Sequence, residues 1–336
     1  MDELQAAIDE LADQIDFSGV VRVDRGDRTT IEAEYGFAHR ALQQPNTVET
    51  RFAIASAVKG WTALVVVSLI ADGTLHLETT ARSVLGADLP LIDDAVTVQH
   101  LLAHRSGIGD YLDEGLGNDI DDYAMTRPVH ELVTTEDYLP MLDGFPQKFP
   151  PGERFEYCNG GFVVLALIAE RTSGVPFHDL IGLRVCRPAG MSRTGFLRSD
   201  ELPADAALGY LSIGRRSRTN VFHLPVLGSG DGGAYTTVAD VRAFWLALFE
   251  GRIVSHDWVA QMVRPFSDVP DEGRRYGLGF WLHETNDVVM LSGYDAGVSF
   301  QSAHDPTTST TYTVISNTAP GAWPMAKLLA AQITGH

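Results

Sequence analysis

Cysteine and lysine are both scarce in this chain of 336 residues, which holds two of the first and three of the second. The N-terminus lacks the basic and apolar segments of a secretory leader, and its sequence MDELQAAIDELADQID instead repeats apolar residues at helical spacing. Without such a leader, we expect Cys158 and Cys186 to be reduced, buried thiols in a cytoplasmic protein.

Long apolar runs, sequence repeats and linkers rich in proline or serine are also absent. The longest apolar candidate, residues 61–70, is too short to cross a bilayer and is followed by Asp72 and Gly73. Positive charge is in short supply as well, because the formal net charge is −19. A strongly acidic surface repels phosphate backbones and anionic lipids, so we expect neither nucleic acid nor membranes as partners.

The order of the predicted elements indicates an α+β fold. Strand patterns at residues 19–23 and 29–35 follow the first helix, and residues 97–200 are mostly helical in pattern. Four more strands and a closing helix follow, at 279–283, 288–293, 298–304, 310–317 and 323–333. Both chain ends should therefore share one antiparallel sheet flanked by helices, with the helical block inserted between them. We place the α/β part at about residues 1–50 and 205–336, and the helical part at about 51–204, within a single unit.

The first chemical signal is the tetrapeptide Ser56-Ala57-Val58-Lys59. Residues three apart on a helix share a face, so the amine of Lys59 can reach the hydroxyl of Ser56. Serine becomes a good nucleophile only when a neighbouring group takes its proton, and a lysine can do so when burial lowers its pKa. The apolar residues 61–70 supply that burial. A Ser-x-x-Lys motif can occur by chance, so by itself it is modest evidence for a catalytic pair. This chain uses arginine for almost all its other cations, and only lysine can lose its proton here, which strengthens the interpretation.

The second signal is Tyr157-Cys158-Asn159. A tyrosine next to an ammonium group can transfer protons, and an asparagine offers both a donor and an acceptor to a substrate carbonyl or amide. The same tripeptide could merely form the turn that enters a helix. We interpret Cys158 as a small packing residue, with a reactive thiol as the alternative.

Together the two motifs resemble those of the serine β-lactamase and penicillin-binding-protein superfamily. The similarity is strongest to the branch of class C β-lactamases, D-alanyl-D-alanine carboxypeptidases and related esterases. It extends over most of the chain and includes VTVQHLLAHRSGI (96–108), PPG (150–152), PAGMSRTGF (188–196), GDGGAYTTVADV (230–241) and YGLGFWL (276–282). The resemblance implies an acylated Ser56, proton transfer by Lys59 and Tyr157, and substrate contact by Asn159. It also implies a β-lactamase/transpeptidase-like fold with the site where the two parts meet.

The third motif of that superfamily, Lys-Thr-Gly or His-x-Gly on a strand, is altered here. The corresponding residues are Leu291-Ser292-Gly293-Tyr294, which we expect to border the substrate. Gly293 would allow close backbone approach, and the N–H groups of Tyr294 and Ser56 would form an oxyanion hole. Leu291 supplies neither a charge nor a donor for a substrate carboxylate. This difference favours an uncharged acyl substrate over a β-lactam or a peptide terminus.

Other patterns carry less weight. His100 and His104 have the spacing of two metal ligands, but no third ligand is apparent, so a structural role in a turn is favoured. Residues 228–233 are rich in glycine without the Gly-Lys-Ser/Thr ending of a phosphate loop and predict a tight turn. We therefore expect neither a metal nor a cofactor. The acidic segment 109–145, which contains three tyrosines, either borders the acyl pocket or forms a solvated loop.

The leading hypothesis is a serine hydrolase that cleaves small carboxylic esters through an acyl-enzyme. Hydrolysis of β-lactams or of D-amino-acid peptides by the same residues is the nearest alternative, and acyl transfer to an alcohol or amine is another. A non-catalytic binding protein on the same fold is disfavoured because Ser56, Lys59 and Tyr157 are all present.

Overall fold

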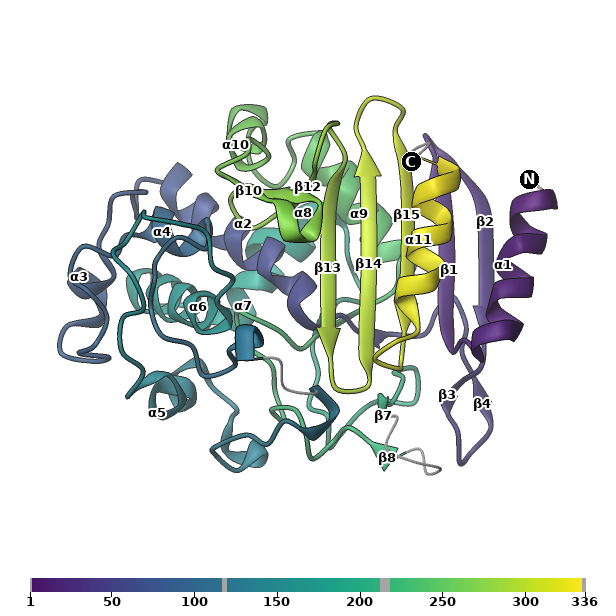
Figure 1. Cartoon of the computed structure of the whole chain (residues 1–336), viewed down its shortest axis with the longest axis horizontal. Helices are drawn as coiled ribbons and strands as arrows, with labels where there is room; N and C mark the ends of the chain where they lie inside the picture. Colours follow the sequence, from purple (N-terminus) through teal and green to yellow (C-terminus); the bar gives the residue numbers. More distant parts are fainter. Residues whose placement is uncertain (1, 117–119, 212–217, 334–336) are drawn as a thin grey trace.

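The structure is a computed structural model that describes residues 2–116, 120–211 and 218–333. Its centre is an eight-stranded antiparallel sheet in the order β10-β11-β12-β13-β14-β15-β1-β2 (Figure 1). The strands are β1 (Gly19–Arg25), β2 (Arg28–Tyr35), β10 (Ser267–Val269), β11 (Arg274–Tyr276), β12 (Trp281–His283), β13 (Val289–Asp295), β14 (Val298–Asp305) and β15 (Thr310–Ser316). The N-terminal strand β1 pairs with the late strand β15, so the prediction that both chain ends share one sheet is confirmed.

Helices cover both faces of this sheet. On one face, α1 (Asp2–Ile15) and α11 (Ala322–Ile333) bury an apolar layer against the strands, and Figure 1 shows α11 lying across β14 and β15. On the other face lie α2 (Val58–Ala71) and α9 (Val238–Phe249), with α10 (His256–Met262) packed on α9. Helix α2 is apolar on nearly every side and almost wholly buried, as its sequence predicted.

The helical part lies beside the β13 side of the sheet and packs around α2 and α6 (Asn159–Ser173) (Figure 1). Its other α-helices are short: α3 (Ala81–Leu85), α4 (Val98–Leu102), α5 (Leu139–Leu142), α7 (Phe177–Ile181) and α8 (Arg187–Ala189). A π-helical turn, Gly182–Cys186, joins the last two. Four 3-10 turns occur in the segment before α5: Glu114–Leu116, Ile120–Asp122, Val129–Glu131 and Thr135–Tyr138.

Three small sheets complete the fold and tie its parts together. Strands β3 (Phe37–His39) and β4 (Gln44–Pro45) pair with each other, as do β7 (Tyr210–Leu211) and β8 (Arg218–Thr219). The third sheet joins β5 (Phe52–Ala53), β9 (Ala234–Thr236) and β6 (Gly195–Phe196). Because β9 lies outside residues 51–204 and its two partners lie inside, the proposed parts share backbone pairing as well as one core. Our division into two parts stays a proposal.

Within the described ranges, no single helix has the length and apolar composition needed to cross a membrane. Helix α6 and residues 177–189 pass that test only as a pair bent by 88°.

Strand β13 comes unusually close to the segment that leads into α2. A Cβ atom added to Gly293 would lie 2.0 Å from the carbonyl oxygen of Ile54 and 3.1 Å from the amide nitrogen of Ala57. Only a residue without a side chain fits between two backbones at this separation. The contact fixes the sheet against the start of the buried helix.

We predict that Gly293→Ala destabilises the protein by about 1–3 kcal/mol, because the strand must move away from Ile54. Gly182→Ala is the matched control, since its added Cβ meets nothing within 4 Å and its backbone is helical. Denaturant unfolding of both variants measures the difference. Equal stability of the two variants would contradict the close contact.

Candidate active site

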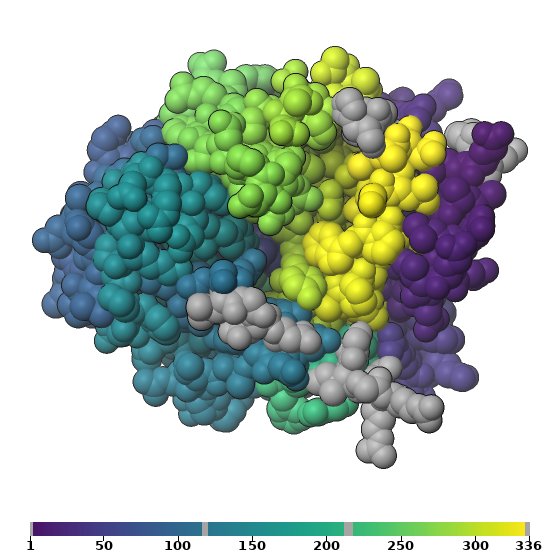
Figure 2. Space-filling view, in the orientation of Figure 1, coloured from purple at the N-terminus to yellow at the C-terminus, as the bar shows by residue number. Residues whose placement is uncertain are grey.

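Ser56 lies where the helical part meets the sheet. It occupies the 3-10 turn η1 (Ala55–Ala57), which runs directly into α2. Ala55 just before it has φ +46°, a left-handed conformation that is costly for a residue with a side chain. The space-filling view shows a hollow between the blue-teal helical part and the yellow-green strands (Figure 2). Ser56 and Tyr157 line a cleft together with residues of β13.

The amine of Lys59 is the centre of the polar contacts around Ser56. Its Nζ lies 2.9 Å from Oγ of Ser56, 2.8 Å from Oδ1 of Asn159 and 2.7 Å from the carbonyl oxygen of Asp231. The side chain is 2% exposed. Burial lowers the pKa of Lys59, against the opposing pull of Asp231 and other nearby carboxylates. The predicted pairing of Ser56 with Lys59 is therefore present in the geometry.

Tyr157 is the second polar side chain that contacts Ser56. Its hydroxyl is hydrogen-bonded to the Ser56 side chain, and its ring lies 5.0 Å from Nζ of Lys59. The ring is held between Trp281, which stacks on it at 6.0 Å, and His104 at 4.3 Å. Burial raises the pKa of Tyr157 well above its ordinary value, with Glu114 adding to the effect. Tyr157 is thus a neutral hydroxyl, not a phenolate, before substrate arrives.

Asn159 begins helix α6, and its amide is held in one orientation. Its Nδ2 donates to the carbonyl oxygen of Leu112 at 2.9 Å and to Oε1 of Glu114 at 3.1 Å, which leaves Oδ1 facing Lys59. The carboxylate of Asp110 accepts the backbone N–H groups of Asn159 at 2.5 Å and of Gly160 at 2.8 Å. This buried carboxylate caps the helix and so positions Asn159; its own pKa is raised by burial to about 6.

The residues of the altered third motif fall into two groups. Ser292, Gly293 and Tyr294 line the cleft together with Ser56. Leu291 does not: it is 2% exposed, and its Cδ2 lies 2.5 Å from the position that a Cβ added to Gly60 would take. Since alternate residues of a strand point to opposite faces, Leu291 faces the core beneath α2. The expectation that Leu291 contacts substrate is not supported by its position.

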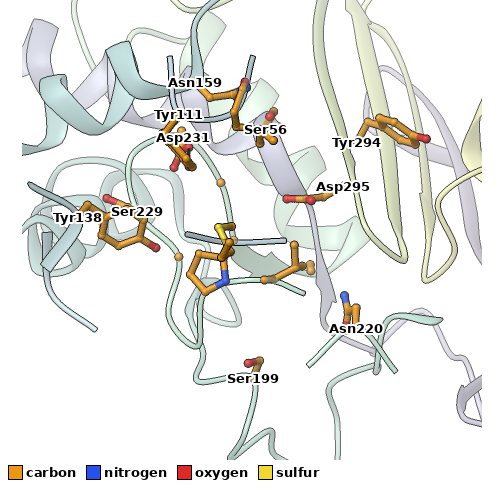
Figure 3. Close-up of a pocket in the computed structure, with 18 of the residues that line it drawn as sticks. Ser56, Tyr111, Tyr138, Asn159, Ser199, Asn220, Ser229, Asp231, Tyr294 and Asp295 are labelled. Carbon is orange, nitrogen blue, oxygen red and sulfur yellow. Dashed lines mark hydrogen bonds between the residues drawn. The ribbon is translucent and has the colours of Figure 1, made fainter. Parts of the chain in front are cut away.

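Three carboxylates near Ser56 were not predicted. Asp231 comes from the glycine-rich turn after residue 228, and its Oδ2 accepts the hydroxyl of Tyr111 at 2.5 Å. Asp295 stands at the end of β13, and burial raises its pKa to about 7. Glu114 comes from the acidic segment 109–145. All three line a second cavity, which Ser56 also lines. Figure 3 shows Asp231 and Asp295 in this cavity together with Ser56.

The acidic segment borders this cavity, which decides between its two interpretations. Tyr111 and Tyr138 line the cavity, and the hydroxyl of Tyr123 supports the first by donating to its carbonyl oxygen at 2.8 Å. The signal that could have identified Asp231 was its place in the GDGG sequence. For Glu114, the signal was its place in the acidic segment 109–145. For Asp295, the sequence offered none, because only the folded chain brings the end of β13 to this cavity.

The histidines have structural roles. Nδ1 of His100 accepts the backbone N–H of Thr97 at 3.2 Å in a capping box, and Nδ1 of His104 accepts that of Cys158 at 3.1 Å. Over the described ranges, no three His, Cys, Asp or Glu side chains are grouped to hold a metal ion. Cys158 is buried, and burial raises the pKa of its thiol well above the ordinary value, which fits a packing role. The predicted tight turn at 228–233 is confirmed by the pairing of Ser229 with Gly232.

Comparison with known proteins agrees with this geometry. The model of the Beta-lactamase family matches residues 4–334. Penicillin-binding protein 4* of Bacillus subtilis is 27% identical over 309 residues, covering 88% of this chain and 66% of its own. A D-aminopeptidase of Cereibacter sphaeroides is 26% identical over 349 residues, covering 100% of this chain and 64% of its own. Esterase EstB of Burkholderia gladioli is 31% identical over 170 residues, covering 49% of this chain and 43% of its own.

Among solved structures, a penicillin-binding protein from Bacillus halodurans has a TM-score of 0.91 and 35% identity, covering 97% of this chain and all of that one. The chain spans about two thirds or less of the length of the curated relatives named above.

The lowered pKa of Lys59 predicts a definite pH dependence. Because only the uncharged amine can accept the serine proton, kcat/KM for a neutral ester should rise with pH and level off above the pKa of Lys59, which lies below the ordinary 10.5. Lys59→Arg should lower kcat/KM by about a hundredfold or more and remove the rise, since arginine keeps its proton. Steady-state kinetics over a pH series measures both effects, with circular dichroism confirming that the variant folds. An unchanged pH profile in Lys59→Arg would contradict this role.

Proposed function

The chain belongs to the Beta-lactamase family of serine hydrolases, and from that premise we propose that it hydrolyses small carboxylic esters through an acyl-enzyme on Ser56. The observation that carries the proposal is the buried amine of Lys59, 2.9 Å from the Ser56 hydroxyl. Nucleophilic catalysis by serine needs a base beside the hydroxyl, and a buried lysine can be that base. A lysine that only formed an ion pair or packed in the core would not need to contact a serine.

The contacts of Lys59 support proton transfer in one direction. A neutral amine has two N–H donors and one lone pair. The two donors are satisfied by the carbonyl oxygens of Asn159 and Asp231, which leaves the lone pair for the hydroxyl proton of Ser56. In the proposed acylation, Oγ of Ser56 bonds to the ester carbonyl carbon while its proton moves to Nζ. The bond to the leaving alkoxide then breaks. Tyr157 donates its hydroxyl proton to the alkoxide oxygen, and the protonated Lys59 returns a proton to Tyr157.

Deacylation reverses these roles with water in place of the alcohol. Lys59, neutral again, takes a proton from water through Tyr157, the hydroxide bonds to the acyl carbon, and Ser56 leaves with its proton restored. In both steps the carbonyl oxygen gains negative charge. We propose that the backbone N–H groups of Ser56 and Tyr294 receive it, a role supported by the close approach of Gly293 to the serine segment.

The charges around Ser56 support an ester without an anionic group. Asp231, Asp295 and Glu114 line the cavity, and they would repel the carboxylate of a β-lactam or of a peptide terminus. The preference for an uncharged substrate therefore rests on repulsion by these carboxylates. It does not rest on the missing donor at Leu291, because that side chain is buried. Hydrolysis of D-aminoacyl peptides or amides by the same residues remains the second candidate, and the same carboxylates favour it over β-lactam hydrolysis. A small molecule is the proposed partner, and a cytoplasmic location stays a prediction.

We predict that a fluorophosphonate probe adds one label to the protein, on the peptide that contains Ser56. Ser56→Ala should abolish labelling because it removes the attacking oxygen, whereas Ser292→Ala should keep it. Intact-mass and peptide mass spectrometry locate the label. Undiminished labelling of Ser56→Ala would show that another residue is the nucleophile.

We also predict that kcat/KM for p-nitrophenyl acetate exceeds that for a chromogenic cephalosporin by about tenfold or more, because the cephalosporin carries a carboxylate. Raising the ionic strength should narrow the ratio, since salt screens the repulsion. Absorbance assays at low and high salt test this. A preference for the cephalosporin at low salt would reverse the proposed order of substrates.

A further inference from the structure

Tyr157 lies on a stretch of chain that neither a helix nor a sheet holds in place. Residues 154–158 belong to no regular element, yet the hydroxyl of Tyr157 is hydrogen-bonded to the Ser56 side chain. Proton transfer depends on this placement, because a shift of about 1 Å in a reacting group can cost on the order of a hundredfold in rate. The position of Tyr157 therefore rests on contacts from other parts of the chain.

His104 contacts the residues on both sides of Tyr157 as well as Tyr157 itself. Its backbone carbonyl oxygen accepts the N–H of Glu156 at 2.9 Å, and its Nδ1 accepts the N–H of Cys158 at 3.1 Å. The centroid of its ring lies 4.3 Å from that of Tyr157, with 35° between the two planes. One residue thus holds the chain before and after Tyr157 and also forms a wall for its side chain.

The imidazole of His104 is buried in aromatic surroundings that suit its neutral form. The residue is 1% exposed, and burial, together with the charge of Lys59, lowers its pKa well below the ordinary value. A neutral ring whose Nδ1 accepts a hydrogen bond carries its proton on Nε2, so Nδ1 stays available to Cys158. Four rings surround the imidazole at centroid distances of 4.3 to 5.8 Å, those of Phe155, Tyr157, Phe162 and Tyr276.

Two features of His104 are costly for a residue that only fills space. Its φ is +52°, a left-handed conformation that few residues with a side chain adopt. Its Nε2 is buried and has no hydrogen-bond partner among the described residues, whereas an apolar side chain would leave no such group unpaired. Costs of this kind persist where the surrounding contacts require them, and they are common at active sites.

We propose that His104 is a positioning residue that directs the hydroxyl of Tyr157 at the oxygen of the leaving alcohol. The proposal rests on the acyl-enzyme function given above and adds a residue to its machinery. His104 exchanges no proton in this role and acts only through Tyr157, whose donated proton lets a poor leaving group depart. A good leaving group such as p-nitrophenolate departs as an anion and needs no proton. The dependence of the rate on the leaving group therefore separates positioning from general stability.

The experiment compares p-nitrophenyl acetate with benzyl acetate, which form the same acyl-enzyme and differ in the alcohol that leaves. His104→Phe keeps a ring beside Tyr157 and removes the acceptor for the N–H of Cys158. His100→Phe is the matched control, because Nδ1 of His100 also accepts a backbone N–H, that of Thr97 at 3.2 Å, but within its own helix cap. Each rate is divided by the concentration of protein that fluorophosphonate labels, so that unfolded protein does not count.

In His104→Phe, kcat/KM for benzyl acetate should fall by about tenfold or more beyond any fall for p-nitrophenyl acetate. Tyr157→Phe should show a larger selective loss, on the order of a hundredfold. The double variant should lose no more than Tyr157→Phe alone, because it has no hydroxyl left to position. His100→Phe should change both esters by the same factor.

A second variant covers the case in which His104→Phe does not fold. His104→Asn keeps an acceptor in place of Nδ1 and suits the left-handed backbone, but it removes the wall beside the Tyr157 ring. The same selective loss on benzyl acetate is expected from it.

Equal losses on the two esters in the His104 variants, beside a selective loss in Tyr157→Phe, would overturn the positioning role and leave the esterase in place. Equal losses in Tyr157→Phe would overturn the proton-donating role of Tyr157 and the role of His104 with it. Failure of the proposed function looks different, since wild type would hydrolyse neither ester and would take no fluorophosphonate label at Ser56.

Discussion

The structure depends on one buried amine. Lys59 is held among Ser56, the side chain of Asn159 and the backbone of Asp231, which come from three distant segments of the chain. Burial is what makes this amine chemically useful, because it disfavours the charged form that could not take a proton. It is also what makes the position demanding, since every donor of the amine must find an acceptor inside the protein. Helix α2, apolar on nearly all sides, and the turn containing Asp231 together meet that demand.

Much of the scaffold was predictable because its elements are long and regular in pattern. The strands now seen as β1, β2, β13, β14 and β15 alternate or run apolar between clear turns. Strands β10 and β11 were missed because each has three residues, including charged ones, and forms only by pairing along the edge of the sheet. Local pattern carries no signal for such tertiary pairing.

The same limit applies to the site. Ser56 and Lys59 are neighbours on one helix, so their meeting followed from spacing. Asp295 reaches the cavity only because the end of β13 converges there with the acidic segment, and its position could not be predicted from local pattern. Leu291 shows the reverse case: alignment with the third motif predicted that it borders the substrate, but the alternation of the strand turns it into the core. Knowing a residue's register in a motif did not reveal which face it occupies.

Burial and the nearby carboxylates have opposite effects on the pKa of Lys59. Asp231, Glu114, Asp110 and Asp295 each raise the pKa of Lys59, while burial lowers it. A substrate carboxylate placed in this cavity would add to the effect of these side chains, raise the pKa of Lys59 and so reduce the fraction of amine that can accept the Ser56 proton. Discrimination against an anionic substrate would therefore appear in the acylation rate as well as in binding.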